Sequence, residues 1–377
     1  MIVPITKPYI TGDEEKEVVK VLRSGWLAQG PQSEKFEKMV AGFVGSKYTV
    51  AFNSCTSALH TALILSGVGE GDEVIVPSFS FIATANSVLH TGARPVFVDI
   101  DERTYNIAPE KIEKAITKKT KAIMPVHQLG LPADMDLILK LAGKYNLKVI
   151  EDAACAIGSE YKGRKIGAGS GISCFSFHPR KVITTGEGGV ITTNSKSVSD
   201  KAKIIRSHGA SISDLARHSA KKVLFEKYKV LGYNYRMSDL EAAVGIVQME
   251  KLPRILRMRR KLAGRYSGRL GKIDCLDVPY VPGYAEPNFQ SYIVRLKKNS
   301  PKSQKQVIQE SQARGIATRP GVMAIHLEPF YRRKYEGISL PVTEECARST
   351  ILLPLFPQMS EKEQDYVIEN LEEVLKK

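Results

Sequence analysis

The sequence predicts an α/β protein whose larger part is a mainly parallel β-sheet covered by helices on both faces. Short apolar runs alternate with stretches of helical periodicity over residues 48–145. Of the 377 residues, 25% are charged and 43% hydrophobic, which is the composition of a globular chain and not of a disordered or fibrous one. The pattern changes beyond about residue 255, and this change predicts a second, smaller α/β unit.

Two helices are expected before the first strand. The first is amphipathic and carries Val18, Val19 and Leu22 on one face. The second has apolar residues at i, i+3, i+4 and i+7 from Phe36 and ends at Gly45. Four strand–helix pairs follow, at 48–52 and 57–66, 74–79 and 83–91, 95–101 and 109–117, and 121–127 and 135–145. The apolar runs KVIEDAA, ISCFSFH and GVITT come next, close together.

A long helix is expected to open at Ser238, because Ser238 and Glu241 have the spacing of a capping box. Its apolar stripe comprises Leu240, Ala243, Val244 and Val247. The smaller unit then contains a strand at 291–297, a helix at 302–314, a strand at 351–356 and a helix at 361–375. We therefore predict a large domain over 1–250 and a small C-terminal domain over 251–377.

Charge and cysteine content exclude several classes of protein. The 55 Lys and Arg against 40 Asp and Glu give a net charge of +15. No nucleic-acid module accompanies these charges, so they indicate either a solvated surface or a positive rim that attracts a phosphorylated small molecule. No run approaches the ~18 apolar residues of a membrane span. The five cysteines include no CxxC pair, so we expect no disulfide framework, no metal site and a cytoplasmic protein.

Three places carry residues suited to chemistry. The strand at 48–52 runs into small hydroxyl residues and a helix start, which suits a phosphate but is also an ordinary helix cap. The strand KVIE delivers Glu151 and Asp152 to its carboxyl end, where an acid can keep a ligand nitrogen protonated or pair with a neighbouring base. Lys181 lies in a turn between two strands, where it is either solvated or, with a lowered pKa, a Schiff-base nucleophile.

Together these features match the needs of pyridoxal 5′-phosphate (PLP). The cradle, the acid and the lysine also occur in the order found in fold type I transaminases. The sequence resembles the DegT/DnrJ/StrS family of PLP-dependent sugar aminotransferases over almost its whole length. The motifs that carry this resemblance are SGWLAQGP (24–31), NSCTSALH (53–60), VIVPSFSFIATANSVLHTGARPVFVDID (74–101), PADMD (132–136), EDAACAIGS (151–159), FSFHPRK with TTGEGG, GYNYRMSDLEAAVG (232–245) and ILLPLFPQMS (351–360).

The resemblance implies a fold type I aminotransferase and a homodimer with shared active sites. It assigns Lys181 as the Schiff-base lysine and Asp152 as the residue facing the pyridine nitrogen. It further implies that Phe81 stacks on the cofactor ring. The phosphate is expected to be held by Cys55, Thr56 and Ser176, and by Asn234 from the neighbouring subunit.

Two departures from the family pattern affect what can be carried over. Cys155 stands where the family usually has Gln or His, at a position that commonly hydrogen-bonds the cofactor's 3-oxygen. A thiol is a weak donor, so Cys155 either tunes the ring weakly or merely packs. The segment GIATRPGVMAIH (315–326) also differs from that of well-known sugar members, so the acceptor cannot be copied from them.

We therefore predict amination of a keto group on a nucleotide-linked deoxy sugar, with L-glutamate as donor, in surface polysaccharide or amino-sugar biosynthesis. Two alternatives remain. The chain could be a PLP-dependent sugar dehydratase, although such relatives replace the Schiff-base lysine and this chain keeps Lys181. It could also be a regulatory relative that binds cofactor without turnover.

Overall fold

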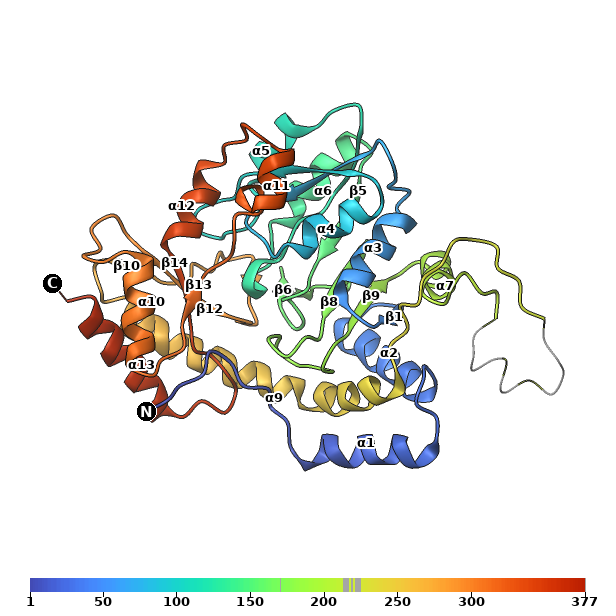
Figure 1. The fold of residues 1–377 in the computed structure, drawn as a ribbon, viewed down its shortest axis with the longest axis horizontal. Helices are drawn as coiled ribbons and strands as arrows, with labels where there is room; N and C mark the ends of the chain where they lie inside the picture. Colours follow the sequence, from blue (N-terminus) through green and yellow to red (C-terminus); the bar gives the residue numbers. More distant parts are fainter. Residues whose placement is uncertain (170, 213–216, 218–219, 221–224, 377) are drawn as a thin grey trace.

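The computed structural model describes residues 1–377 except 170, 213–216, 218–219, 221–224 and 377. Its centre is a seven-stranded sheet in the order β1-β9-β8-β5-β4-β2-β3 (Figure 1). The strands are β1 (Tyr48–Phe52), β2 (Glu73–Pro77), β3 (Arg94–Val98), β4 (Thr120–Ile123), β5 (Lys148–Asp152), β8 (Ile172–Ser176) and β9 (Gly189–Thr193). Only β9 runs against its neighbours, so the described sheet is mainly parallel.

Helices cover both faces of this sheet, because its central strands are apolar on both sides. One face packs against α3 (Cys55–Leu65), α4 (Ala83–His90) and α7 (Lys196–Ile205). The other packs against α2 (Pro31–Val44), α5 (Pro109–Ala115), α6 (Met135–Lys144) and the first half of α9 (Asp239–Leu270). This arrangement confirms the predicted fold class.

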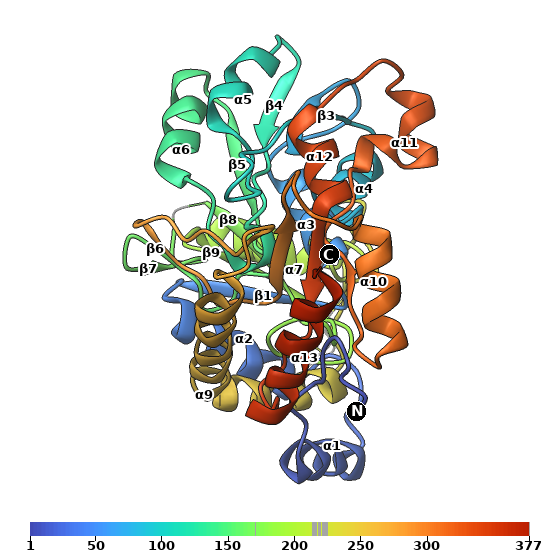
Figure 2. The same ribbon diagram turned by 90° about the vertical axis from the view of Figure 1, so that its left-hand side faces the viewer.

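The smaller unit is built on a four-stranded antiparallel sheet in the order β10-β12-β14-β13. Its strands are β10 (Leu276–Asp277), β12 (Tyr292–Leu296), β13 (Arg319–Pro320) and β14 (Thr350–Leu353). Helices α10 (Gln304–Ala313) and α13 (Glu361–Val374) lie beside this sheet, which Figure 1 labels, and Figure 2 shows the two helices from another side. Other elements of the described residues include β6 (Glu160–Tyr161), β7 (Arg164–Lys165), β11 (Ala285–Glu286), η1 (Gln128–Gly130), η2 (Ile325–Leu327), α11 (Pro329–Lys334) and α12 (Pro341–Ser349).

Helix α9 connects the two units. It begins at the expected capping box of Ser238 and continues for 32 residues through Pro253. Its first half packs on the large sheet, whereas Leu262 and Tyr266 lie in the apolar cluster of the smaller unit. The proposed limits, 1–250 and 251–377, therefore fall inside one continuous helix, and this division stays a prediction.

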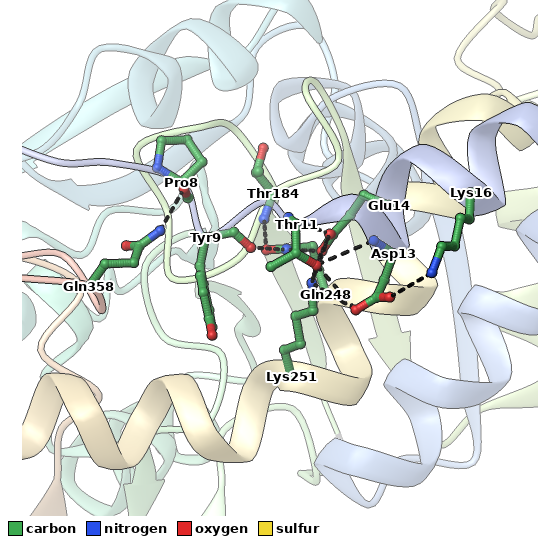
Figure 3. A network of polar contacts seen from close by, with 10 residues as sticks. All are labelled: Pro8, Tyr9, Thr11, Asp13, Glu14, Lys16, Thr184, Gln248, Lys251 and Gln358. Carbon is green, nitrogen blue, oxygen red and sulfur yellow. Dashed lines mark hydrogen bonds and ion pairs between the residues drawn. The ribbon is translucent and has the colours of Figure 1, made fainter.

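The opening helix α1 (Gly12–Ser24) leaves part of its apolar face exposed. Val19 is 40% and Leu22 is 53% exposed, and the apolar residue buried in this helix is Val21. Polar contacts attach the helix to α9 instead: both carboxylate oxygens of Glu14 accept hydrogen bonds from Lys251 Nζ, at 2.8 and 2.7 Å (Figure 3). The expected opening helix is therefore present, and Val19 and Leu22 on its apolar face are exposed in the single chain.

Two predicted boundaries shift for local reasons. Helix α3 begins at Cys55, two residues before its expected start, because the Ser54 side chain caps it. Strand β14 ends at Leu353, because Pro354 has no N–H to offer a partner strand. Among the described residues, no helix is long and apolar enough to cross a membrane.

Candidate active site

The expected phosphate cradle lies where β1 and β8 end and the antiparallel strand β9 between them begins. Gly189 of β9 pairs with Phe52 of β1 and with Ser176 of β8. A Cβ atom on Gly189 would lie 2.5 Å from the backbone nitrogen of Cys55, so only glycine allows α3 to begin this close to the sheet. Ser176 and the first turn of α3 therefore lie on either side of Gly189.

The first turn of α3 has free backbone donors. The Ser54 hydroxyl accepts a hydrogen bond from Ser57 N at 3.1 Å. Within the described part of the chain, the N–H groups of Cys55 and Thr56 have no acceptor. Free N–H groups at the positive end of a helix dipole favour a phosphate. Burial, and then the Asp152 charge, raise the pKa of the Cys55 thiol, so we assign to Cys55 a backbone role only.

Asp152 is buried at the carboxyl end of β5. Its Oδ2 accepts a hydrogen bond from Thr84 Oγ1 at 2.7 Å, and its Oδ1 accepts one from Ala154 N at 3.2 Å. Burial raises the pKa of Asp152, and these hydrogen bonds and the Lys181 charge offset the effect only in part. A cationic ligand nitrogen would stabilise the ionised form. Sequence reasoning missed Thr84, whose only signal is a hydroxyl in the helix after the Phe81 loop.

Glu151 has a different role from Asp152, because successive residues of a strand face opposite sides. Its Oε2 lies 2.9 Å from His127 Nε2, and its Oε1 accepts a hydrogen bond from Ser173 Oγ at 3.0 Å. Since His127 Nδ1 accepts from Ala133 N at 3.0 Å, we assign the ring proton to Nε2. The pairing with a neighbouring base that the sequence allowed is therefore made by Glu151, which leaves Asp152 for chemistry.

Lys181 lies in the turn between β8 and β9. Its Nζ donates a hydrogen bond to Cys155 Sγ at 3.1 Å, and both side chains are half-buried. Asp152 is close enough for its charge to act on the Lys181 ammonium. The structure thus brings Lys181, Asp152 and Cys155 together at one edge of the sheet.

The electrostatic setting of Lys181 differs from that of a typical amine nucleophile. Burial opposes the ammonium form, but Cys155, Cys55 and Asp152 together outweigh it and raise the pKa of Lys181. The sequence argument required a lowered pKa, and the isolated chain has the opposite direction. The pKa is raised because acidic groups surround Lys181 Nζ in the isolated chain. A cationic ligand nitrogen paired with Asp152 would cancel the effect of the Asp152 charge on Lys181.

Hydrogen bonds from distant elements hold the lysine turn. Gln290 Nε2 donates to the carbonyl of Arg180 at 2.6 Å. Gln248 of α9 accepts from Thr184 N at 3.4 Å and donates to the carbonyl of Tyr9 at 2.8 Å (Figure 3). The turn is therefore fixed to both the smaller unit and the N-terminal segment, although neither glutamine has a recognisable motif.

Phe81 lies on the loop after β2, and its ring is 64% exposed. Hydrogen bonds link the same loop to Asp152. The Ser80 hydroxyl lies 2.7 Å from Thr84 Oγ1, which in turn donates to Asp152. An exposed aromatic ring beside a buried acid is available to cover a planar ligand. The stacking role of Phe81 stays a prediction.

The divergent segment 315–326 packs against the Phe81 loop. Ile325 N donates to the carbonyl of Ser78 at 2.8 Å, and Ser78 Oγ lies 2.7 Å from His326 Nδ1. The segment that was expected to differ from well-known sugar aminotransferases therefore lies next to the loop of Phe81, the residue proposed to stack on the cofactor.

Asn234 has an exposed side chain and lies beside the cradle of its own chain. Its carbonyl accepts a hydrogen bond from Asn53 Nδ2 at 3.4 Å, and the carbonyl of Tyr235 accepts one from Asn53 N at 2.9 Å. Its contact with a partner's cofactor stays a prediction.

The groups at this site fit PLP, because each part of the cofactor has a suitable partner among them. The free N–H groups of α3 with Ser176 suit the phosphate, and the Asp152 carboxylate suits the pyridine nitrogen. The Lys181 amine suits the aldehyde, and the exposed Phe81 ring suits a stacking contact.

Residues 8–372 match the DegT/DnrJ/EryC1/StrS aminotransferase family. The chain belongs to this family. It is 38% identical to the spore coat polysaccharide biosynthesis protein SpsC of Bacillus subtilis, with coverage of 99% of this chain and 97% of SpsC.

Solved structures give the same result. DesV of S. venezuelae, crystallised with a ketimine intermediate, matches with a TM-score of 0.91 and 32% identity over 100% of this chain and 99% of DesV. PseC of Helicobacter pylori, an aminotransferase involved in pseudoaminic acid biosynthesis, matches with a TM-score of 0.92 and 28% identity over 100% of this chain and 99% of PseC.

The cofactor follows from the family and its structures, some of which are PLP forms or contain the amino form of the cofactor, PMP. The protein is therefore a PLP-dependent sugar aminotransferase of fold type I. The predicted family, fold class, enzyme class and cofactor are confirmed. The roles of its individual site residues stay predictions.

Proposed function

We propose that this aminotransferase converts a keto group of a nucleotide-linked deoxy sugar to an amine, with L-glutamate as the amino donor. The observation that carries the proposal is the placement of Lys181 Nζ and the buried Asp152 at one strand edge. The polysaccharide role of SpsC supports a pathway that builds surface polysaccharide. The net charge of +15 supports a substrate that carries a diphosphate.

Each cofactor-binding residue has a proposed role. Lys181 Nζ holds PLP covalently, and Asp152 binds the ring nitrogen. The N–H groups of Cys55 and Thr56 and the Ser176 hydroxyl bind the phosphate. Phe81 covers the ring, and Cys155 faces the 3-oxygen.

PLP, when bound, supplies the electron sink that amino-group transfer requires. Lys181 Nζ, freed by the incoming amine, would take the proton from Cα of glutamate and would deliver it to C4′ of the cofactor. Asp152 stays ionised and keeps the ring nitrogen protonated. Lys181 performs the same proton movements in reverse for the sugar, so glutamate and ketone become 2-oxoglutarate and amine.

We propose that the enzyme is a homodimer whose active sites are shared. Asn234 is exposed, and Val230 and Leu231, a few residues before it, are exposed apolar side chains. A second copy that covered this stretch would remove apolar surface from water and carry Asn234 toward the partner's phosphate site.

Two other functions make different predictions. A PLP-dependent dehydratase would lack a lysine at position 181, which this chain retains. A regulatory relative would bind the cofactor without turnover, and the weak donor at Cys155 is the feature by which the sequence left that alternative open.

The test is a screen of UDP-, GDP- and dTDP-linked 4-keto-6-deoxy sugars with glutamate. Mass spectrometry of the sugar and release of 2-oxoglutarate are the two readouts. Transamination predicts an amino sugar and an equal amount of 2-oxoglutarate. A dehydrated sugar without 2-oxoglutarate would indicate the dehydratase, and bound PLP with no glutamate-dependent release would indicate the regulatory relative.

A further inference from the structure

We propose that Cys155 and Lys181 form a reversible sulfur–nitrogen cross-link when the cofactor-free chain meets hydrogen peroxide. Sγ of Cys155 and Nζ of Lys181 are 3.1 Å apart, with the lysine donating to the sulfur. A cysteine sulfenic acid condenses with a backbone nitrogen to give a sulfenamide, and the proposal extends this reaction to a side-chain amine. The nitrogen that donates a hydrogen bond to this sulfur is the amine that the proposed function assigns to the cofactor.

Two buried amides hold the pair in place. Asn288 Nδ2 donates to the carbonyl of Cys155 at 2.8 Å, and Gln290 Nε2 donates to the carbonyl of Arg180 at 2.6 Å. Gln290 N in turn donates to Asn288 Oδ1 at 2.8 Å. One three-residue segment therefore fixes the backbones that carry both reacting atoms, which makes an intramolecular reaction favourable.

Access distinguishes Cys155 from the other cysteines. It is half-buried, whereas the other four cysteines, Cys55, Cys174, Cys275 and Cys346, are buried. Oxidation follows exposure and thiolate character, so peroxide is expected to reach Cys155 first.

The first step oxidises the sulfur. The Cys155 thiolate attacks one oxygen of hydrogen peroxide, an S–O bond forms and the O–O bond breaks. The second oxygen is reduced and leaves as water after it takes a proton. The product is the sulfenic acid of Cys155.

The second step joins Lys181 Nζ to the oxidised sulfur, 3.1 Å away in the reduced protein. It requires the neutral amine, and burial is the effect that opposes the ammonium form of Lys181. The nitrogen lone pair forms an S–N bond, the S–O bond breaks, and the oxygen leaves as water with one proton from the nitrogen.

The cross-link would lock the cofactor-free enzyme. Lys181 could not hold PLP until a thiol reductant restored the free amine and thiol. Bound PLP would occupy Nζ and prevent the reaction. This consequence rests on the proposed role of Lys181, whereas the cross-link itself rests only on the geometry.

The test treats the PLP-free and PLP-loaded full chain with hydrogen peroxide and maps peptides without reduction. In the PLP-free chain we expect the Cys155 and Lys181 peptides to be joined, ~2 Da lighter than their sum because two hydrogens are lost. Dithiothreitol should reverse the change, and the PLP-loaded chain should lack it.

Matched variants identify the atoms. Cys155→Ser and Lys181→Arg should each abolish the cross-link, since a guanidinium stays protonated, and Cys275→Ser should retain it. A mass loss that persists in Lys181→Arg would indicate a disulfide and overturn the proposal. A sulfenic or sulfinic acid on Cys155 with Lys181 still free would also overturn it, and so would an unoxidised Cys155. Borohydride labelling of the untreated, PLP-loaded chain tests the proposed function separately, because a missing label on Lys181 leaves the cross-link result intact.

Discussion

Thr84→Val tests whether the buried acid controls cofactor binding. Thr84 is 1% exposed, and its hydroxyl donates to Asp152 Oδ2 at 2.7 Å. An ionised carboxylate only accepts, so the hydroxyl of Ser80, 2.7 Å from Thr84 Oγ1, must donate to Thr84. Valine keeps the shape of threonine but removes this donor from Asp152 and the acceptor from Ser80.

A hydrogen bond to a charged group contributes about 1.5–3 kcal/mol, and about 1.4 kcal/mol is a tenfold change in binding. We therefore expect Thr84→Val to weaken PLP binding about ten- to a hundredfold. Burial already raises the pKa of Asp152, and loss of the Thr84 hydrogen bond raises it further. Asp152 then becomes protonated at a higher pH than in the wild type, so the loss of PLP on acidification should begin at a higher pH.

The assay is an absorbance titration of PLP at several pH values between about 5 and 9. Thr84→Ser keeps the hydroxyl and should stay close to wild type. Thr61→Val is the matched control, because Thr61 is fully buried in α3 and its Oγ1 has no hydrogen-bond partner in the described structure. Wild-type affinity in Thr84→Val, or an equal loss in Thr61→Val, would refute this account of Asp152.

Three further predictions follow from the same site. Lys181→Ala should abolish transamination and borohydride labelling without unfolding the protein, because the lysine lies in a half-buried turn; label on another lysine would contradict the assignment. In the cofactor-free protein, the raised pKa of Asp152 means that the native state binds more protons than the unfolded one, so stability falls as pH rises from about 3.8 through the folded pKa. Asp152→Asn should remove this loss and raise the melting temperature at pH 8 while transamination disappears, and an unchanged pH profile of melting would count against it. Asn234→Ala should weaken PLP retention by about 1–2 kcal/mol, and mixing it with Lys181→Ala should restore activity if sites are shared; no recovery after verified subunit exchange would place Asn234 in its own subunit's site.

The sequence determined the elements whose signals are local. Alternating apolar runs predicted the strands of the large sheet, and the capping box at Ser238 marked the start of α9. The packing face of α1 was not predictable, because Val19 and Leu22 satisfy the helical period whether or not a partner covers them. The direction of β9, opposite to that of β1 and β8, was not predictable either. It depends on which strands pair, and no local sequence pattern encodes that pairing.

The sequence by itself also supplied the chemical types at the site and their order, because Lys181, Asp152 and the hydroxyl-rich helix start lie in recognisable motifs. Tertiary structure alone decided which groups contact one another. Thr84 bonds Asp152 across 68 residues, and Asn288 holds Cys155 across 133. A hydrogen bond requires its two atoms to lie within about 3 Å, and separation along the chain carries no information about that distance. The chain therefore encodes what the site contains, and the convergence of strand ends and loops sets the protonation and reactivity of each group.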